Sequence, residues 1–136
     1  MMLNTIKLST ICKLVDGRFV GDSSATINSV SIDSRNHFFN DKTLFIALKS
    51  KKRDGHDYIL EAYNKGARCF LVEKSPLNNY DDANFIIVKD SLSALQQWAK
   101  KHRSKFKNPV IAITGSNGKT IVKEWLYHFL KGKYNI

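Results

Sequence analysis

Short, uninterrupted apolar segments alternate with helical patterns along this chain, and that alternation restricts its fold more than any other feature. The segments span residues 43–48, 69–72, 85–88 and 110–113. Runs of this length without polar alternation are typical of strands buried on both faces of a parallel sheet. The pattern therefore predicts an α/β fold whose largely parallel sheet is covered on both faces.

Apolar residues at three- and four-residue spacing predict four helices between and after these strands. They cover residues 8–15, a segment between a cap at Asp57 and a stop at Gly66, a segment after a cap at Asp90 or Ser91, and residues 119–131. Two further short strands are predicted at 18–21 and around 30–32. Trp98 and Trp125 lie at helical core positions, so we expect both side chains to pack in a core.

The composition excludes several classes of protein. With 43% hydrophobic and 25% charged residues, seven Gly and two Pro, the chain is neither wholly disordered nor collagen-like. Its longest apolar run is far short of the ~20 residues that a membrane span requires. Cys12 and Cys69 are too few for a disulfide scaffold and lack metal-ligand spacing, so we expect reduced thiols in the cytoplasm.

The net charge of +10 is unevenly distributed, because residues 90–136 hold nine of the 22 basic residues and two of the 12 acidic ones. The densest part is the end of a predicted helix, with Lys100, Lys101, Arg103, Lys105 and Lys107. Cations there complement the helix dipole, and they also attract phosphates. A basic nucleic-acid-binding module is therefore an alternative, although aromatic residues at core positions and a glycine-rich loop argue against it.

Residues 111–120, IAITGSNGKT, combine an apolar strand, a glycine-rich turn and a helix start, the order that phosphate binding requires. Gly115 and Gly118 permit backbone conformations that let N–H groups converge on phosphate oxygens. Lys119 can reach the β- and γ-phosphates, and the Thr120 hydroxyl is placed to bind Mg²⁺. The strict pattern has a glycine where this chain has Ile113, so the loop is a shortened variant.

The segment 114–120 resembles the ATP loop of the Mur ligases, the cytoplasmic ligases of peptidoglycan assembly. Asp33-Ser34-Arg35 is similar to a motif in the N-terminal domain of the MurE and MurF branches of that family. Residues 44–59 are similar to the F-x-A-L…D-G-H-x-F-I stretch of the same branches. Lys123-Glu124 resembles the MurF branch, and residues 121–125 also resemble chains in which a MurF-like half precedes an alanine racemase.

The resemblance implies a small N-terminal domain of the MurE/MurF type, followed by the first strand, phosphate loop and helix of an incomplete, P-loop ATPase-like central domain. It implies a ligase that uses ATP and Mg²⁺ to join D-alanyl-D-alanine to UDP-N-acetylmuramoyl-tripeptide through an acyl phosphate. A MurE-type ligase that adds the third amino acid is the alternative. In full length the protein is expected to be a cytoplasmic monomer that binds no nucleic acid and has no membrane span.

Several residue roles are carried over from the resemblance. Lys119 is the implied catalytic residue, Thr120 the Mg²⁺ ligand, and Ser34 the substrate contact, with Asp33 and Arg35 shaping its turn. The implied ATP contacts are Thr114, Gly115, Ser116, Asn117, Gly118, Lys119 and Thr120. The family's other catalytic residues would follow Ile136, so residues 1–136 alone are expected to be inactive.

The implied domain organisation has three parts. Residues 1–85 would bind the UDP-substrate, residues 86–108 would form a connecting strand and basic helix, and residues 109–136 would begin the ATP-binding domain. From the residues alone, Arg35 is expected to pair with Asp33 or Asp41, and His56 to cap a helix. His37, His102 and His128 show no partner spacing, and we expect them at the surface.

Overall fold

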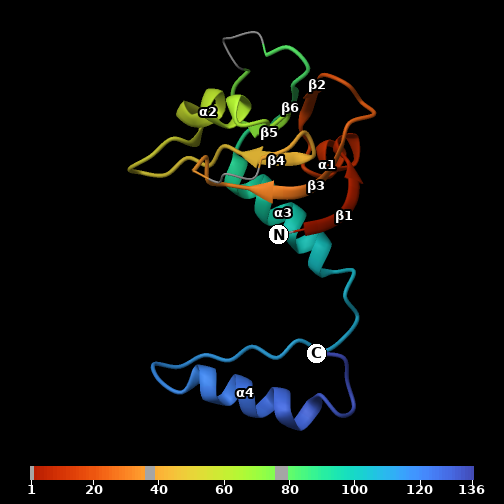
Figure 1. Cartoon of the computed structure of the whole chain (residues 1–136), viewed down its shortest axis with the longest axis vertical. Helices are drawn as coiled ribbons and strands as arrows, with labels where there is room; N and C mark the ends of the chain where they lie inside the picture. Colours follow the sequence, from red (N-terminus) through yellow and green to blue (C-terminus); the bar gives the residue numbers. More distant parts are fainter. Residues whose placement is uncertain (1, 36–38, 76–79) are drawn as a thin grey trace. The chain divides into compact units, whose positions relative to one another are not determined.

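A mixed six-stranded sheet is the centre of the first of two units in this chain. The computed structural model describes residues 2–35, 39–75 and 80–136, and contacts divide the chain into Met1–Lys105 and Phe106–Ile136 (Figure 1). Each unit is described by itself. Within the described residues the strands are β1 (Met2–Lys7), β2 (Arg18–Val20), β3 (Thr26–Ser31), β4 (Thr43–Ile46), β5 (Cys69–Val72) and β6 (Asn84–Ile87).

The strand order is β1-β3-β4-β5-β6-β2. The four central strands, β3 to β6, run parallel to one another, and the edge strands β1 and β2 pair antiparallel with β3 and β6. The predicted largely parallel sheet is therefore confirmed. The sequence pattern did not predict β1, whose residues 2–7 mix polar and apolar types.

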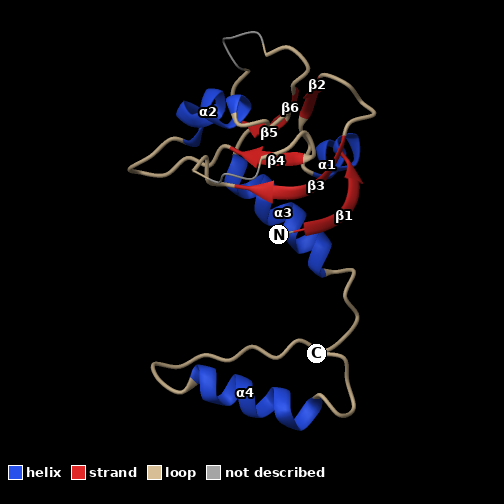
Figure 2. Ribbon diagram, in the orientation of Figure 1, coloured by secondary structure: helices blue, strands red, loops and turns tan. Residues whose placement is uncertain are grey.

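Alternate residues of the central strands enter two separate cores, which explains why these strands are apolar throughout. Leu44 and Ile46 belong to one core, which α1 (Leu8–Leu14) and α3 (Ser91–Arg103) cover. Phe45 belongs to the other core, which α2 (Ile59–Asn64) covers. Figure 2 shows these helices around the sheet. Both faces are covered, as predicted, and Trp98 of α3 is only 8% exposed.

Two polar side chains start the helices that follow β4 and β6. Asp90 caps α3 by accepting a hydrogen bond from the Ser93 backbone N–H, as predicted. The predicted cap at Asp57 is wrong. A 3₁₀ turn, η1 (Gly55–Tyr58), precedes α2, so the first N–H group in need of a partner is that of His56, and Asp54 accepts it.

The second unit contains α4 (Lys119–Leu130) and no strand, since all of residues 106–136 are described. The predicted buried strand at 110–113 is wrong: Val110 is 64% exposed, because no neighbouring strand in this unit pairs with its backbone. Trp125, predicted to pack in a core, is 62% exposed, and no residue of α4 is buried. His128 is exposed and His102 half-buried, whereas His37 lies outside the described residues.

Candidate functional site

The candidate substrate site lies at the carboxyl ends of the four parallel strands. Asp33-Ser34-Arg35 follows β3, the segment 49–56 follows β4, Glu73 follows β5 directly, and Asp90-Ser91 follows β6 at the start of α3. Ligands of open α/β sheets bind at this edge, because the loops that leave it converge there. The sheet thus gathers the polar residues of four loops into one region of the first unit.

Asp33 and Arg35 form a closed pair at the end of β3. The Arg35 guanidinium donates from Nε and Nη2 to the Asp33 carboxylate, with Nη2 at 2.7 Å, and the Arg35 backbone N–H also donates to it. These hydrogen bonds, aided by the nearby Arg53 charge, lower the pKa of Asp33 to about 2. Of the two partners expected for Arg35, the structure shows Asp33. The Arg35 side chain remains 77% exposed and can meet an anionic group.

Ser34 sits between this pair and α2, and it is buried. Its carbonyl oxygen accepts a hydrogen bond of 2.7 Å from the Lys65 ammonium. The Glu61 carboxylate accepts a hydrogen bond of 2.6 Å from Lys65, and both Lys65 and the Ser34 side chain lower the pKa of Glu61. Motif reasoning missed Glu61 and Lys65, although their four-residue spacing is that of a helical ion pair.

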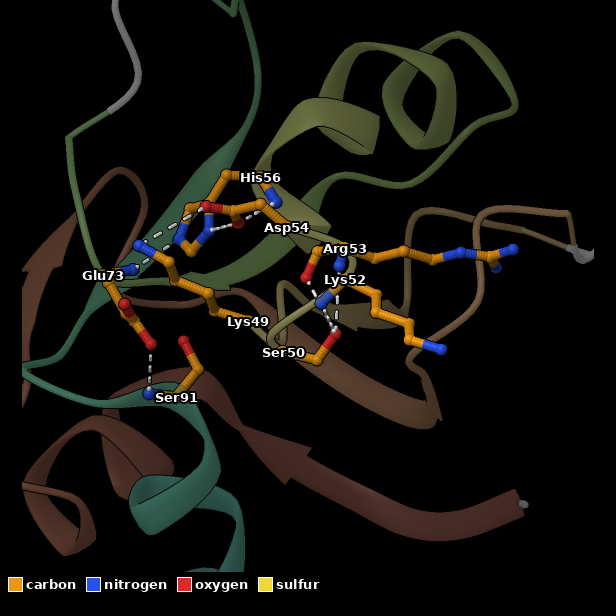
Figure 3. A network of polar contacts seen from close by, with 8 residues as sticks. All are labelled: Lys49, Ser50, Lys52, Arg53, Asp54, His56, Glu73 and Ser91. Carbon is orange, nitrogen blue, oxygen red and sulfur yellow. Dashed lines mark hydrogen bonds and ion pairs between the residues drawn. The ribbon is translucent and has the colours of Figure 1, made fainter.

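A second polar network joins the loop after β4 to β5 and α3 (Figure 3). The Glu73 backbone N–H donates to His56 Nε2 at 2.8 Å, so the ring proton lies on Nδ1, which contacts Asp54 Oδ1 at 2.5 Å. Glu73 Oε1 in turn accepts from the backbone N–H of Ser91 at 3.0 Å. Three loops are thereby tied together, and His56 serves as their structural link rather than as a free ligand group.

The loop between β4 and η1 is a tight turn with outward-pointing cations. Ser50 accepts at Oγ from the Arg53 backbone N–H and donates to the Arg53 carbonyl. Lys49 lies 4.0 Å from Asp54, whereas the side chains of Lys52 and Arg53 point away from the His56 network (Figure 3). Their charges, with Arg35, make this edge of the sheet suited to an anionic ligand.

Gly55 is required at the base of this turn. A Cβ atom there would lie 2.7 Å from the Leu48 backbone nitrogen and 2.8 Å from its carbonyl oxygen, closer than real Cβ atoms approach backbone. The Gly55 N–H donates to that same carbonyl oxygen. The Asp-Gly-His sequence therefore combines a cap, a close backbone approach and a link to β5.

The phosphate loop lies in the second unit, at the N-terminus of α4. Gly118 is the residue before the helix, with φ of +77°, and Gly115 has φ of +147°. L side chains rarely adopt these conformations, so both glycines are needed for the loop. The first turn of α4 has no acidic residue, so its free N–H groups present a positive end to an anion.

Lys119 folds back over this loop, where its ammonium donates to the carbonyl oxygens of Gly115 at 2.5 Å and of Ser116 at 3.4 Å. The ammonium therefore already lies on the loop where phosphates would bind. All of Thr114–Thr120 is exposed, consistent with an accessible loop. All of the predicted ATP contacts belong to the second unit. The predicted substrate contacts, Asp33, Ser34 and Arg35, belong to the first unit.

Neither unit offers a preformed metal centre within the described residues, since no three His, Cys, Asp or Glu side chains gather there. Cys12 and Cys69 are both free and buried. None of the helices in the described part of the chain is long and apolar enough to cross a membrane.

Comparison with known proteins shows which family this chain is similar to. The Mur ligase family, catalytic domain, matches residues 26–103. The UDP-N-acetylmuramoyl-tripeptide--D-alanyl-D-alanine ligase of Haemophilus influenzae is 36% identical over 88% of this chain and 26% of its own length. The ligase of the same name from Bacillus subtilis is 33% identical over 100% of this chain and 29% of its own. The chain thus spans less than a third of these relatives.

Two solved structures of MurF ligases are similar to this chain. MurF from Acinetobacter baumannii has a TM-score of 0.82 and 25% identity, covering 98% of this chain and 29% of that one. The MurF ligase of Thermotoga maritima in complex with ADP has a TM-score of 0.61 and 34% identity, covering 77% of this chain and 23% of that one.

Proposed function

Because this chain belongs to the Mur ligase family, we propose that it is the substrate-binding and phosphate-loop part of an ATP-dependent ligase joining D-alanyl-D-alanine to UDP-N-acetylmuramoyl-tripeptide. The observation that carries the proposal is that relatives with this activity in their names match 76–100% of the chain at 33–44% identity. We further propose that the enzyme acts as a monomer in the cytoplasm.

In this proposal the second unit binds the triphosphate of ATP. The N–H groups at the start of α4 and the Lys119 ammonium provide positive charge, and the two glycines leave room for phosphate oxygens. The MurF neighbour from Thermotoga maritima was solved in complex with ADP, which supports nucleotide binding by a ligase of this kind. Lys119 would contact the transferred phosphoryl group and stabilise the charge that develops there.

The Thr120 hydroxyl fits a role as one ligand of Mg²⁺. A magnesium ion in such a site takes most of its ligands from phosphates and water, so a single protein hydroxyl suits the absence of an acidic cluster among the described residues. When bound, the ion would neutralise charge on the phosphates. Thr120 would orient it, and Lys119 would act on the phosphoryl oxygens themselves.

The first unit, in this proposal, binds the UDP part of the peptide substrate at the carboxyl edge of its sheet. Ser34 and Arg35 would contact the substrate, and Asp33 would hold the Arg35 fork in place. Arg35 and the cations of the loop 49–53 offer charge for a diphosphate. The hydrogen bonds of His56 and Glu73, which join three of the loops at this edge, would keep it rigid.

A ligase that adds the third amino acid is the second candidate. Relatives named UDP-N-acetylmuramoyl-L-alanyl-D-glutamate--2,6-diaminopimelate ligase match at 30–36% identity. The two candidates accept different partners, so a ligase carrying this sequence can be assayed with each pair. Phosphate release with the tripeptide nucleotide and D-alanyl-D-alanine supports the first, and release with the dipeptide nucleotide and diaminopimelate supports the second.

Lys119→Ala tests the phosphate loop in a ligase that carries this sequence. We expect turnover of ATP to fall by about 10²–10³-fold or more, because one charged group that stabilises the transition state is lost. Binding of UDP-N-acetylmuramoyl-tripeptide should stay nearly intact. Lys133→Ala, a change at an exposed lysine beyond α4, is the matched control. Comparable turnover by the Lys119 variant would remove this loop from the mechanism.

A further inference from the structure

The short helix α2 is linked to Ser34 through two charged side chains. Lys65, at the C-cap of α2, donates from Nζ to the Ser34 carbonyl oxygen at 2.7 Å and to Glu61 Oε1 at 2.6 Å. The Ser34 side chain and Lys65 both lower the pKa of Glu61. The Lys65 ammonium thus joins the Ser34 carbonyl to the Glu61 carboxylate.

The hydrogen bonds of Lys65 hold the turn 33–35 against a distant part of the chain, which the Asp33–Arg35 pair does not do. The hydrogen bonds of Asp33 and Arg35 join these two residues to each other and to Ser31, so they shape the turn locally. The hydrogen bond from Lys65 to the Ser34 carbonyl oxygen joins residues 31 positions apart in the sequence. It ties the turn to α2, the helix that covers the core containing Phe45. This bond sets where the turn lies relative to the rest of the sheet edge.

Ser34 itself is buried, and the two groups that link it to α2 are partly exposed. Ser34 is 6% exposed, the Lys65 side chain 31% and the Glu61 side chain 42%. Charge-assisted hydrogen bonds at a partly buried position are stronger than those between neutral groups. Gly66, with φ of +105°, ends α2 where a Cβ would lie 3.3 Å from the Phe39 carbonyl oxygen, so the helix end packs closely on the backbone of Phe39.

From this arrangement we infer that Glu61 and Lys65 are positioning residues for the turn 33–35 and thereby set the affinity for the nucleotide substrate. The inference rests on the proposed function, which places the substrate at Ser34 and Arg35. Neither Glu61 nor Lys65 needs to touch the substrate. Their effect passes through the position of Ser34.

The test compares Lys65→Met, which keeps the stem and removes the ammonium, with Lys65→Arg, which keeps a donor. Lys13→Met, at an exposed position in the last turn of α1, is the matched control. Calorimetric titration with UDP-N-acetylmuramoyl-tripeptide should show about tenfold weaker binding by Lys65→Met, since a charge-assisted hydrogen bond is lost. Lys65→Arg should recover most of the affinity, and Lys13→Met should bind like the unchanged chain.

Amide hydrogen exchange at Ser34 and Arg35 gives a readout that needs no ligand. Exchange there should be faster in Lys65→Met and unchanged in Lys13→Met, with thermal unfolding of the first unit preserved in both. If Lys65→Met unfolds, Glu61→Gln takes its place in both measurements. Equal affinity or equal exchange in the variant and the unchanged chain would overturn the inference. If the unchanged chain does not bind the nucleotide, substrate binding by this unit fails, while the exchange rates still decide whether α2 holds the turn.

Discussion

Asp33 illustrates how far one residue's chemistry departs from its ordinary behaviour. Hydrogen bonds from Arg35 lower its pKa from 3.8 to about 2, so the folded chain holds this carboxylate ionised where most carboxylates are protonated. Because the pKa is lower in the folded state, the pair contributes its full stability above pH 3.8. That contribution is lost as the pH falls through about 2.

Titration of the Asp33 carboxyl carbon by NMR measures this pKa directly. We expect a midpoint near 2 in the unchanged chain and a midpoint closer to 3.8 in Arg35→Met, which lacks the donors. Identical midpoints for Asp33 in the two chains would show that the pair does not control its ionisation.

The pKa of Cys69 is shifted in the opposite direction, upward from its ordinary value. Burial raises the pKa of its thiol from 9.0 to about 11, so the reactive thiolate is scarce at neutral pH. We expect iodoacetamide to modify Cys69 slowly in the folded chain at pH 8 and rapidly in denaturant, as followed by mass spectrometry. Cys12, whose pKa burial also raises, should behave likewise. Fast modification of Cys69 in the folded state would contradict its buried position.

At the scale of elements, the apolar segments form the predicted strands only where a neighbouring strand is present to pair with them. Residues 43–46, 69–72 and 84–87 form strands because each has a parallel partner, and their alternate residues fill two cores. The segment 110–113 has the same apolar character and remains unpaired. Strand β1 was missed because its pairing with β3, rather than its own pattern, makes it a strand.

The candidate site was predictable in part for the same reason. The phosphate loop and the turn 33–35 are contiguous motifs, so their residues could be named from sequence. Glu61 and Glu73 belong to no such motif, and only the folded sheet brings them to Ser34 and to Ser91. Contacts between residues far apart in the chain depend on tertiary structure, which a local pattern does not encode.

Gly55→Ala tests the close approach between the loop after β4 and η1. The added methyl group would meet Leu48 backbone atoms at 2.7–2.8 Å, so the backbone at position 55 and the backbone of Leu48 must separate. We expect the free energy of unfolding of the first unit to fall by about 1–3 kcal/mol, as measured by urea denaturation. Gly132→Ala, where a Cβ meets nothing within 4 Å, is the control. Equal stability of the two variants would mean that the loop tolerates a side chain at position 55.

At the scale of the whole molecule, the two units differ in whether they have a buried hydrophobic core. The first has two cores and a sheet edge with four converging loops, whereas the second has an exposed loop and a helix without buried residues. On α4, Ile121, Trp125 and Phe129 are exposed apolar residues. Nucleotide affinity needs a rigid loop and a pocket for the base, and in this unit the loop is exposed and no residue of α4 is buried.

We therefore expect the 136-residue chain to bind UDP-N-acetylmuramoyl-tripeptide through its first unit but Mg-ATP only weakly, with no ligase activity. Calorimetry with each ligand in turn tests this difference, and the nucleotide-peptide titration serves as the control for folded protein. Micromolar binding of Mg-ATP by the chain alone would show that the loop and α4 suffice for the nucleotide.

The chain has two tryptophans, and the structure puts one in each unit: Trp98 is 8% exposed in the first, and Trp125 is 62% exposed in the second. Each unit therefore carries its own natural fluorophore. Emission from Trp98 should be blue-shifted and resistant to acrylamide, and emission from Trp125 red-shifted and readily quenched. Replacing either residue by Phe leaves a reporter for the other unit, so ligand binding and melting can be followed separately by light alone.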